Sequence, residues 1–243
     1  MPSRLLTIKA HPILKGLAEH LVAGAKVVQR EVNLESTLVV LPTQRARRLF
    51  EHYVLDAAEQ KKVLVVPPEI TTPGRIADLF VPPTGIPANA VTLGLVDAQV
   101  WSELPEHSRA LVEGVSATES SRESLIQRLG RLHHECCLAL VDFSRVRDEI
   151  PEGLSGGQER EVWDVLVSWQ EARQQKLDAL QMQCPATEQS RAIRAASIEP
   201  GAVERVILVD GDSLHSRTAL LEVLDQKGVD IDRVVPQESS PAP

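Results

Sequence analysis

The sequence predicts an α/β protein in which helices flank a parallel sheet. The main observation is a set of short apolar runs without polar alternation, a pattern typical of strands that are covered on both faces. The runs are LLTI (5–8), TLVVLP (37–42), KVLVVP (62–67), RVILVD (205–210) and DRVVP (232–236). Helical patterns follow several of these runs, and strand–helix alternation at both ends of the chain indicates an α/β fold.

Three amphipathic segments are expected to cover this sheet. In residues 13–28 apolar side chains recur at helical spacing, and residues 44–58 repeat the pattern after the run at 37–42. Thr43 stands directly before the second segment, where a helix favours a capping hydroxyl. The third segment, 214–226, is followed shortly by a glycine, a residue that often ends helices.

The middle of the chain has a different pattern. It shows almost no strand signal and several amphipathic helical stretches, and proline-rich segments border it on both sides. We therefore expect residues 1–90 to form the first part of the α/β domain, 91–198 a helical insertion subdomain, 199–236 the return to the α/β domain and 237–243 a disordered tail.

Composition narrows the classes of function. The net charge of −8 argues against a free-standing, strongly DNA-binding protein, because neutralising phosphates needs a basic face, although a local basic patch is compatible with it. Three cysteines do not make a disulfide framework and fit a reducing cytoplasm. No apolar run is long enough to cross a bilayer, and the N-terminus lacks the apolar core of a signal peptide. We expect a cytoplasmic protein without a membrane partner.

The string LSGGQER (154–160) begins with the signature of ATP-binding-cassette ATPases. Such enzymes also need a phosphate-binding loop, GxxxxGK[ST], between a strand and a helix, because its backbone amides and its lysine hold the phosphates. The sequence contains no such string. We therefore interpret LSGGQER as a glycine-containing turn before a helix, and we expect no nucleotide cofactor.

Three segments resemble motifs of superfamily 1 helicases, in the same order along the chain. TLVVLPTQRARRLFEHYVL resembles motif Ia, in which a strand delivers a threonine and a helix start to the DNA backbone, and VVPPEITTPGRIADLF resembles the segment after it. RVILVDGDSLHSRTALLEVL resembles the Walker B motif, with Asp210, Gly211 and Asp212 following its strand. Gly211 stands where these helicases have the carboxylate that positions water.

The order of these segments resembles the N-terminal region of AddB- and RecC-type subunits of bacterial helicase–nuclease complexes, which process double-strand breaks. The resemblance implies a P-loop-like, helicase 1A-like sheet with an all-helical, 1B-like insertion and a lost ATP site. The runs 37–42 and 205–210 must then lie in one parallel sheet. It further implies weak DNA backbone contacts, a partner subunit of AddA type and no catalytic residue. Family members continue into a metal-dependent nuclease domain, for which this sequence shows no candidate site.

Seven residues at two expected helix starts are candidates for DNA contact: Thr43, Arg45, Arg47 and Arg48 in the first group, and Thr71, Thr72 and Arg75 in the second. Guanidinium groups and the free backbone amides of a helix start both favour phosphate. The alternative for the first group is a solvated helix face. The alternative for the second is a turn with Pro73 at the first helical position.

The sequence supplies no convincing metal or catalytic site. HHECC (133–137) places His133 three and four residues before two cysteines, but zinc needs four ligands and only Cys184 remains. Buried cysteines beside half-exposed histidines explain the segment as well. Asp210 and Asp212 could hold Mg²⁺ beside a bound triphosphate, but without a phosphate loop a helix cap is the better role for Asp212.

These observations lead to one principal hypothesis and two alternatives. The principal hypothesis is a non-catalytic, helicase-like module that guides DNA within a double-strand break repair complex. The first alternative is an active P-loop ATPase or helicase with a degenerate site. The second is a protein–protein scaffold without DNA, which the net acidity favours. Nucleotide binding separates the first alternative from the others, and salt-dependent DNA binding separates the principal hypothesis from the scaffold.

Overall fold

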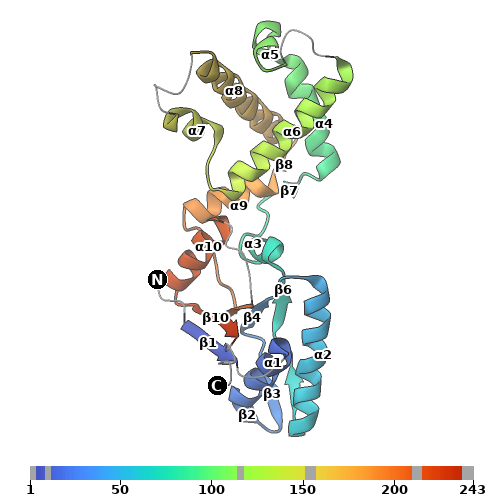
Figure 1. The fold of residues 1–243 in the computed structure, drawn as a ribbon, viewed down its shortest axis with the longest axis vertical. Helices are drawn as coiled ribbons and strands as arrows, with labels where there is room; N and C mark the ends of the chain where they lie inside the picture. The colour runs from blue at the N-terminus through green and yellow to red at the C-terminus, as the bar shows by residue number, and fades with distance from the viewer. Residues whose placement is uncertain (1–3, 9–11, 114–117, 151–156, 210–214, 237–243) are drawn as a thin grey trace, which may run out of the picture. The chain divides into compact units, whose positions relative to one another are not determined.

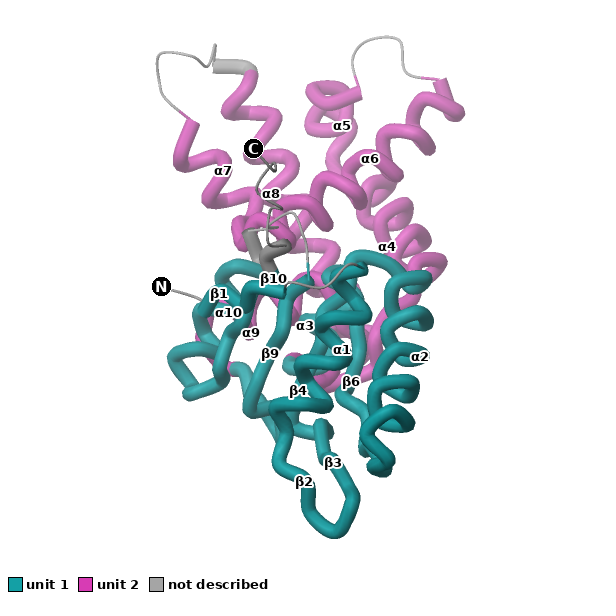
Figure 2. The backbone as a smooth tube through the Cα atoms, turned by 60° about the horizontal axis from the view of Figure 1, so that its bottom comes forward, with its two compact units in different colours: residues 1–80, 198–213, 217–243 teal, residues 81–197, 214–216 magenta. Residues whose placement is uncertain are grey.

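The computed structural model describes residues 4–8, 12–113, 118–150, 157–209 and 215–236 (Figure 1). The chain divides into two compact units, coloured in Figure 2. Unit 1 comprises residues 1–80, 198–213 and 217–243, and unit 2 comprises residues 81–197 and 214–216. Unit 1 is the α/β part and unit 2 the helical part, so the chain leaves unit 1 after Phe80 and returns to it at Ile198.

A five-stranded sheet forms the centre of unit 1. All of its neighbouring pairs are parallel, and their order is β1-β10-β9-β4-β6. The strands are β1 (Arg4–Ile8), β10 (Asp230–Pro236), β9 (Arg205–Val209), β4 (Thr37–Val40) and β6 (Glu69–Thr71). Every residue of β4 is buried, as expected for a strand that is covered on both faces.

The pairing of β4 with β9 confirms an important expectation. Val39 lies opposite Ile207 in parallel register, although residues 81–197 of unit 2 lie between the two strands in the sequence. The runs 37–42 and 205–210 therefore belong to one parallel sheet. The predicted α/β class, with helices beside a parallel sheet, is confirmed.

Helices of unit 1 supply the apolar cover that such a sheet needs. α1 (Ile13–Gly24) and α2 (Gln44–Lys61) contact each other and share one core with the sheet. Leu17 of α1 and Phe50 of α2 are fully buried in this core. α10 (His215–Gln226) also has its leucines buried.

One expected strand lies in a different sheet. The run 62–67 contains β5 (Leu64–Val66), which pairs with β3 (Glu31–Asn33) in a separate three-stranded sheet. β2 (Val27–Val28) pairs with β3 as an antiparallel hairpin, whereas the sequence assigns its residues to the first helix. Both predictions were wrong because α1 ends early, at Gly24, and because β5 is only half covered, with an exposed leucine at its start.

Unit 2 is built from helices. They are α4 (Ala90–Glu103), α5 (Glu106–Glu113), α6 (Glu119–Leu138), α7 (Phe143–Glu149), α8 (Gly157–Ala179) and α9 (Pro185–Arg194). Its strands among the described residues are β7 (Ile86–Pro87) and β8 (Met182–Gln183), which pair only with each other. Within the described chain, unit 2 thus adds no strand to the main sheet. Residues 81–90, which the sequence analysis assigns to the α/β part, belong to unit 2.

The core of unit 2 combines aromatic rings with a buried ion pair. The rings of Phe143 and Trp169 stack with centroids 6.2 Å apart. Arg173 Nε donates to Asp97 Oδ1 at 2.6 Å, and both side chains are almost fully buried. Gly130 of α6 makes room for this pair, because a Cβ there would lie 2.9 Å from Asp97 Oδ2.

Candidate nucleic-acid interface at the carboxyl edge of the sheet

The main sheet has a switch point between β4 and β9. From β4 the chain passes through α2 to β6 on one side, whereas from β9 it passes through α10 to β10 on the other. Open α/β sheets bind ligands at the carboxyl ends of the strands beside such a point. Figure 1 shows α2 starting at this edge, near the end of β6.

β4 and β6 bring two helix starts to this edge. The strands are parallel neighbours, and the backbone amide of Leu41 donates to the carbonyl of Thr71 at 2.9 Å. α2 begins shortly after β4, and the short helix η1 (Pro73–Arg75), continued by α3 (Ile76–Phe80), begins after β6. The two groups of candidate residues therefore stand at neighbouring strand ends.

Thr43 is the N-cap of α2. Its backbone is extended, and its hydroxyl oxygen accepts a hydrogen bond from the backbone amide of Ala46 at 3.1 Å. The capping role expected for Thr43 is confirmed. Because this role occupies the hydroxyl oxygen, Thr43 acts mainly by fixing the helix start, whose remaining first-turn amides suit an anion.

The three arginines of the first group differ in their surroundings. Arg47 Nε donates to Glu51 Oε1 at 3.0 Å, one helical turn further along α2. Arg45 and Arg48 are exposed, and no carboxylate of the described chain lies within ion-pair distance of either. Their charges are therefore available to a phosphate, whereas the charge of Arg47 is partly offset.

The second group forms the turn that the alternative interpretation describes. Pro73 occupies the first helical position of η1, and the carbonyl of Thr72 accepts from the amide of Arg75 at 2.9 Å. Thr71 is buried, so its side chain presents little surface. The Arg75 side chain is 68% exposed and lies 3.8 Å from an Asp78 carboxylate oxygen. Arg75 thus supplies an accessible positive charge to the second group, although a carboxylate lies nearby.

A groove of about 460 Å³ between α2, β6 and α3 connects the two groups. Its charged lining consists of Arg47, Arg75, Glu51, Glu69 and Asp78. Three carboxylates face two guanidinium groups there, so the groove itself does not attract phosphate. The surface that suits phosphate is the exposed start of α2, with Arg45 and Arg48.

The degenerate Walker B position, Asp210, Gly211 and Asp212, lies outside the described residues. Its strand is described up to Val209, and Leu208 lies opposite Val40 of β4. The position therefore follows a strand that ends at the same edge as β4. LSGGQER also begins outside the described residues, and from Gly157 onward it forms the start of α8.

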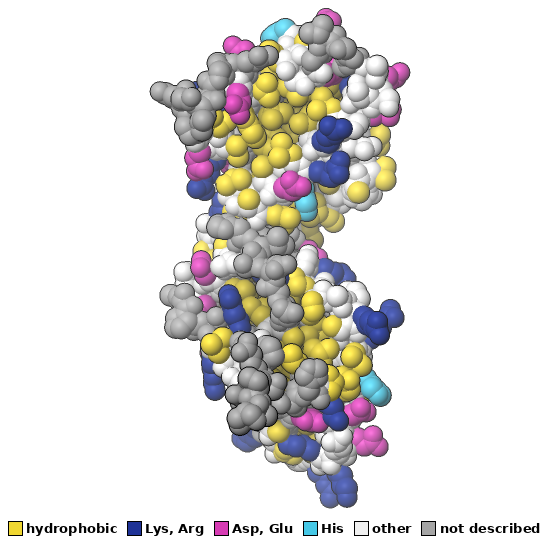
Figure 3. All heavy atoms as spheres, in the orientation of Figure 1, with side chains coloured by type: hydrophobic (Ala, Val, Ile, Leu, Met, Phe, Trp, Pro, Cys, Tyr) yellow, Lys and Arg dark blue, Asp and Glu magenta, His cyan; other side chains and the backbone are white. Residues whose placement is uncertain are grey.

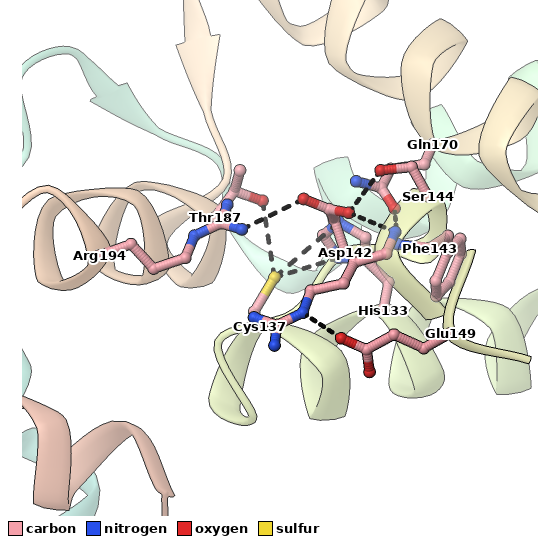
Figure 4. Close-up of polar contacts among 10 residues, drawn as sticks. His133, Cys137, Asp142, Phe143, Ser144, Glu149, Gln170, Thr187 and Arg194 are labelled. Carbon is pink, nitrogen blue, oxygen red and sulfur yellow. Dashed lines mark hydrogen bonds and ion pairs between the residues drawn. The ribbon is translucent and has the colours of Figure 1, made fainter. Parts of the chain in front are cut away.

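The HHECC segment belongs to the core of unit 2. Cys137 Sγ lies 3.9 Å from His133 Nδ1 and 3.9 Å from Thr187 Oγ1 (Figure 4). Both cysteines of the segment are buried, as expected, and so is His133, for which the expected half-exposure was wrong. The described residues contain no group of three or more His, Cys, Asp or Glu side chains that could hold a metal ion.

Burial sets the protonation states in this segment. Burial, together with the positive charge of Arg173, lowers the pKa of His133 to about 3. Burial also raises the pKa of Cys137 to about 11. Both side chains are therefore neutral at pH 7, and a buried thiol that stays protonated is a poor nucleophile and metal ligand.

The acidic partners of two candidate arginines were not predicted from the sequence. Glu51 stands four residues after Arg47, and Asp78 stands three residues after Arg75. Helices bring residues at these spacings together on one face. The spacing therefore indicated that Arg47 and Arg75 share their charges with carboxylates. Arg45 and Arg48 have no such partner among the residues that the structure describes.

No model of a known protein family matches this chain, and no curated protein matches it. Among the described residues, no helix combines the length and the apolar character needed to cross a membrane. A functional proposal for this chain therefore depends on the strand ends, helix starts and charges of the carboxyl edge.

Proposed function

We propose that this chain is a non-catalytic DNA-guiding module, similar to the inactivated helicase-like N-terminal region of AddB- and RecC-type subunits. The observation that carries the proposal is the parallel pairing of β4 with β9 around a helical unit. It supports the motif order on which the helicase resemblance depends. It also supports a ligand site at the carboxyl edge, where both strands end.

The chemistry of the carboxyl edge supports contact with the DNA backbone rather than with bases. Arg45 and Arg48 are exposed and free of carboxylates within the described chain, and they stand in the first turns of an 18-residue helix. Guanidinium groups pair with phosphate oxygens, and the amides of the helix start add partial positive charge. Such contacts position DNA without reading its sequence.

The sequence supports guiding without catalysis. It contains no GxxxxGK[ST] loop, and Gly211 occupies the position of the catalytic carboxylate in Walker B. Without these groups a bound triphosphate has nothing to hold its phosphates or to position water. We therefore assign the motor activity of the complex to a partner subunit of AddA type.

Fluorescence anisotropy with a short labelled DNA duplex over a series of salt concentrations tests the proposal. Binding should be weak, with a slope of log K against log salt of about −2 to −4, since three or four phosphates are neutralised. Arg45→Gln/Arg48→Gln should flatten the slope by about two units, since each contact contributes about 0.9. Arg47→Gln is the matched control on the same helix and should change the slope little.

Two outcomes would contradict this assignment. If the double variant binds DNA like the parent, the start of α2 is only a solvated helix face. If calorimetry detects stoichiometric binding of Mg-ATP at sub-millimolar concentration, the chain is a degenerate ATPase and not an inactivated module.

One observation favours the scaffold as a second candidate. The groove beside Arg47 and Arg75 carries an excess of carboxylates, which suits a protein partner better than DNA. The same titration separates the two functions, because a scaffold would show no salt-dependent DNA affinity in the parent chain.

A further inference from the structure

The small sheet of unit 1 exposes a row of side chains on its outer face. In the register of its strands, Val28 lies opposite Glu31, and Glu31 lies opposite Leu64. Residues paired in this way point to the same face of a sheet. Val28 is 55% exposed and Leu64 is 72% exposed, whereas Val32 on the other face is fully buried. The row therefore presents two aliphatic side chains with a carboxylate between them.

Basic side chains border this row. Arg30 is at the turn of the β2–β3 hairpin, and Lys61 and Lys62 lie at the end of α2, three and two residues before β5 begins. All three are exposed, and within the described chain none forms an ion pair. The amide of Leu64 donates to the carbonyl of Arg30 at 2.8 Å, which holds the two basic segments together. We call Val28, Arg30, Lys61, Lys62 and Leu64 the hairpin patch.

Local effects explain the presence of only some of the basic side chains in the hairpin patch. Lys61 is in the last turn of α2, where a cation stabilises the helix dipole, so its presence has a local cause. Arg30 has no such cause. Figure 3 shows Lys and Arg side chains at the end of unit 1 where Figure 1 places the β2–β3 hairpin.

The hairpin turn holds two non-glycine residues in the left-handed conformation. Gln29 and Arg30 both have positive φ values, 52° and 66°. Two-residue turns of this kind favour Asn and Gly, because the left-handed conformation costs other residues about 1 kcal/mol or more. Backbone strain of this kind is often found where a protein holds side chains for binding. Arg30 stands on this turn, two residues after Val28.

We propose that the hairpin patch binds a protein segment that carries aliphatic and acidic side chains. An apolar centre with a charged rim is the anatomy of protein–protein interfaces. The three free cations are complementary to carboxylates, and the two aliphatic side chains provide the apolar contact. DNA fits less well, because the two aliphatic side chains add nothing to phosphate contacts.

This proposal is independent of the DNA-guiding function. The hairpin patch adjoins the C-terminal end of α2, whereas Arg45 and Arg48 stand at its start. At 1.5 Å per residue, the helix separates these two regions by roughly 24 Å. Variants of one surface therefore leave the other intact.

Selection of peptides from a random 12-residue phage-displayed library on the full chain tests the inference. The enriched peptides should combine at least two acidic with at least two aliphatic residues. Titration of one labelled, enriched peptide should show about tenfold weaker binding to Leu64→Ser and to Arg30→Gln/Lys61→Gln/Lys62→Gln. Leu55→Ser, which removes another exposed leucine of unit 1, should bind like the parent. Circular dichroism checks that each surface variant is folded.

Three results would overturn the inference. The first is a set of enriched peptides without acidic residues, or binding that ignores the patch variants. The second is loss of duplex DNA binding in the triple Gln variant, which would make the patch a nucleic-acid contact. The third is self-association in sedimentation velocity that Leu64→Ser abolishes, which would make a second copy of the chain the occupant.

Discussion

His133 lies among aromatic rings in the core of unit 2. Its ring packs edge-on against Phe143 and Trp169, with centroids 5.9 Å and 6.2 Å away. Burial is the main cause that lowers its pKa to about 3, and the nearby charge of Arg173 lowers it further. A histidine in the unfolded chain titrates near 6.5, so between these values the unfolded state binds a proton that the folded state excludes.

The stability of unit 2 should consequently fall as the pH falls from about 6.5 towards 3. The neutral histidine contributes fully above its unfolded pKa, and that contribution is lost as the pH decreases through the window. At about 1.4 kcal/mol per pKa unit, the whole effect is on the order of 5 kcal/mol. Urea unfolding at several pH values, followed by tryptophan fluorescence, measures it.

The three tryptophans of the chain, Trp101, Trp163 and Trp169, all belong to unit 2, so their fluorescence reports on this unit. His133→Leu should remove the histidine part of the pH dependence. His134→Leu, which changes the exposed neighbour, should retain it. If His133→Leu and the parent lose stability in parallel between pH 7 and pH 4, His133 is not the group that binds the proton.

The role or burial of a residue could be predicted from the sequence where it depends on neighbouring residues in the chain or on the residue type alone. Thr43 caps α2 because a hydroxyl before a helix has a backbone amide within reach. Cys136 and Cys137 are buried as expected. The surroundings of His133 depend on rings from α7 and α8, which no local pattern specifies. This is why its burial was not predicted.

At the scale of elements, the ion pair of Asp97 and Arg173 joins α4 to α8. The two side chains are about 95% buried, and Arg173 also lies over the ring of Trp169, 5.8 Å from its centroid. Removing one partner of a buried pair leaves the other charge without compensation, which costs about 3–5 kcal/mol. Asp97→Leu should therefore destabilise unit 2 by this amount.

Replacing both partners provides the control for this prediction. Asp97→Leu/Arg173→Met removes both charges and should recover most of the lost free energy of unfolding. Tryptophan fluorescence during urea unfolding measures all three proteins. A single variant that loses less than about 1 kcal/mol would show that Arg173 finds another partner, and the pair would then not hold α4 to α8.

The elements that could be predicted are those whose apolar pattern is complete. After their first residues, Thr37 and Arg205, β4 and β9 are apolar. Every residue of β4 is buried and those of β9 are buried or half-buried, so their assignment to a parallel sheet was correct. β5 has a similar composition, but its residues are only exposed or half-buried. No local feature of the sequence distinguishes such a strand from a fully buried one. The β2–β3 hairpin was missed because its turn, Gln29–Arg30, lacks the Asn-Gly signal of such turns.

The positions of the candidate site residues could be predicted from the sequence, but the charge balance around them could not. The helix starts follow from the order of strand, turn and helix, so six of the seven candidate residues lie at or beside a helix start, whereas Thr71 is the last residue of β6. Their charge balance also depends on Glu69, which β6 brings into the groove beside α2. Such a contact between elements is set by the sheet order and not by the spacing of residues.

For the whole molecule, we propose that DNA lies along the carboxyl edge of the sheet. α2 permits a direct test because it runs from that edge to the opposite side of unit 1. Gln44 and Gln60 are both exposed, and they stand near opposite ends of this helix. A photoreactive residue, benzoylphenylalanine, can replace either one, with about 24 Å between the two positions.

Photocrosslinking of each variant to a labelled DNA duplex at low salt is the most direct measurement. We predict a strong protein–DNA crosslink from position 44 and little or none from position 60, because in the proposed function Arg45 and Arg48 contact the phosphate backbone at the start of α2. Arg45→Gln/Arg48→Gln in the position-44 variant should abolish the crosslink. Equal crosslinking from both positions, or crosslinking from position 60 alone, would contradict the proposed path of DNA.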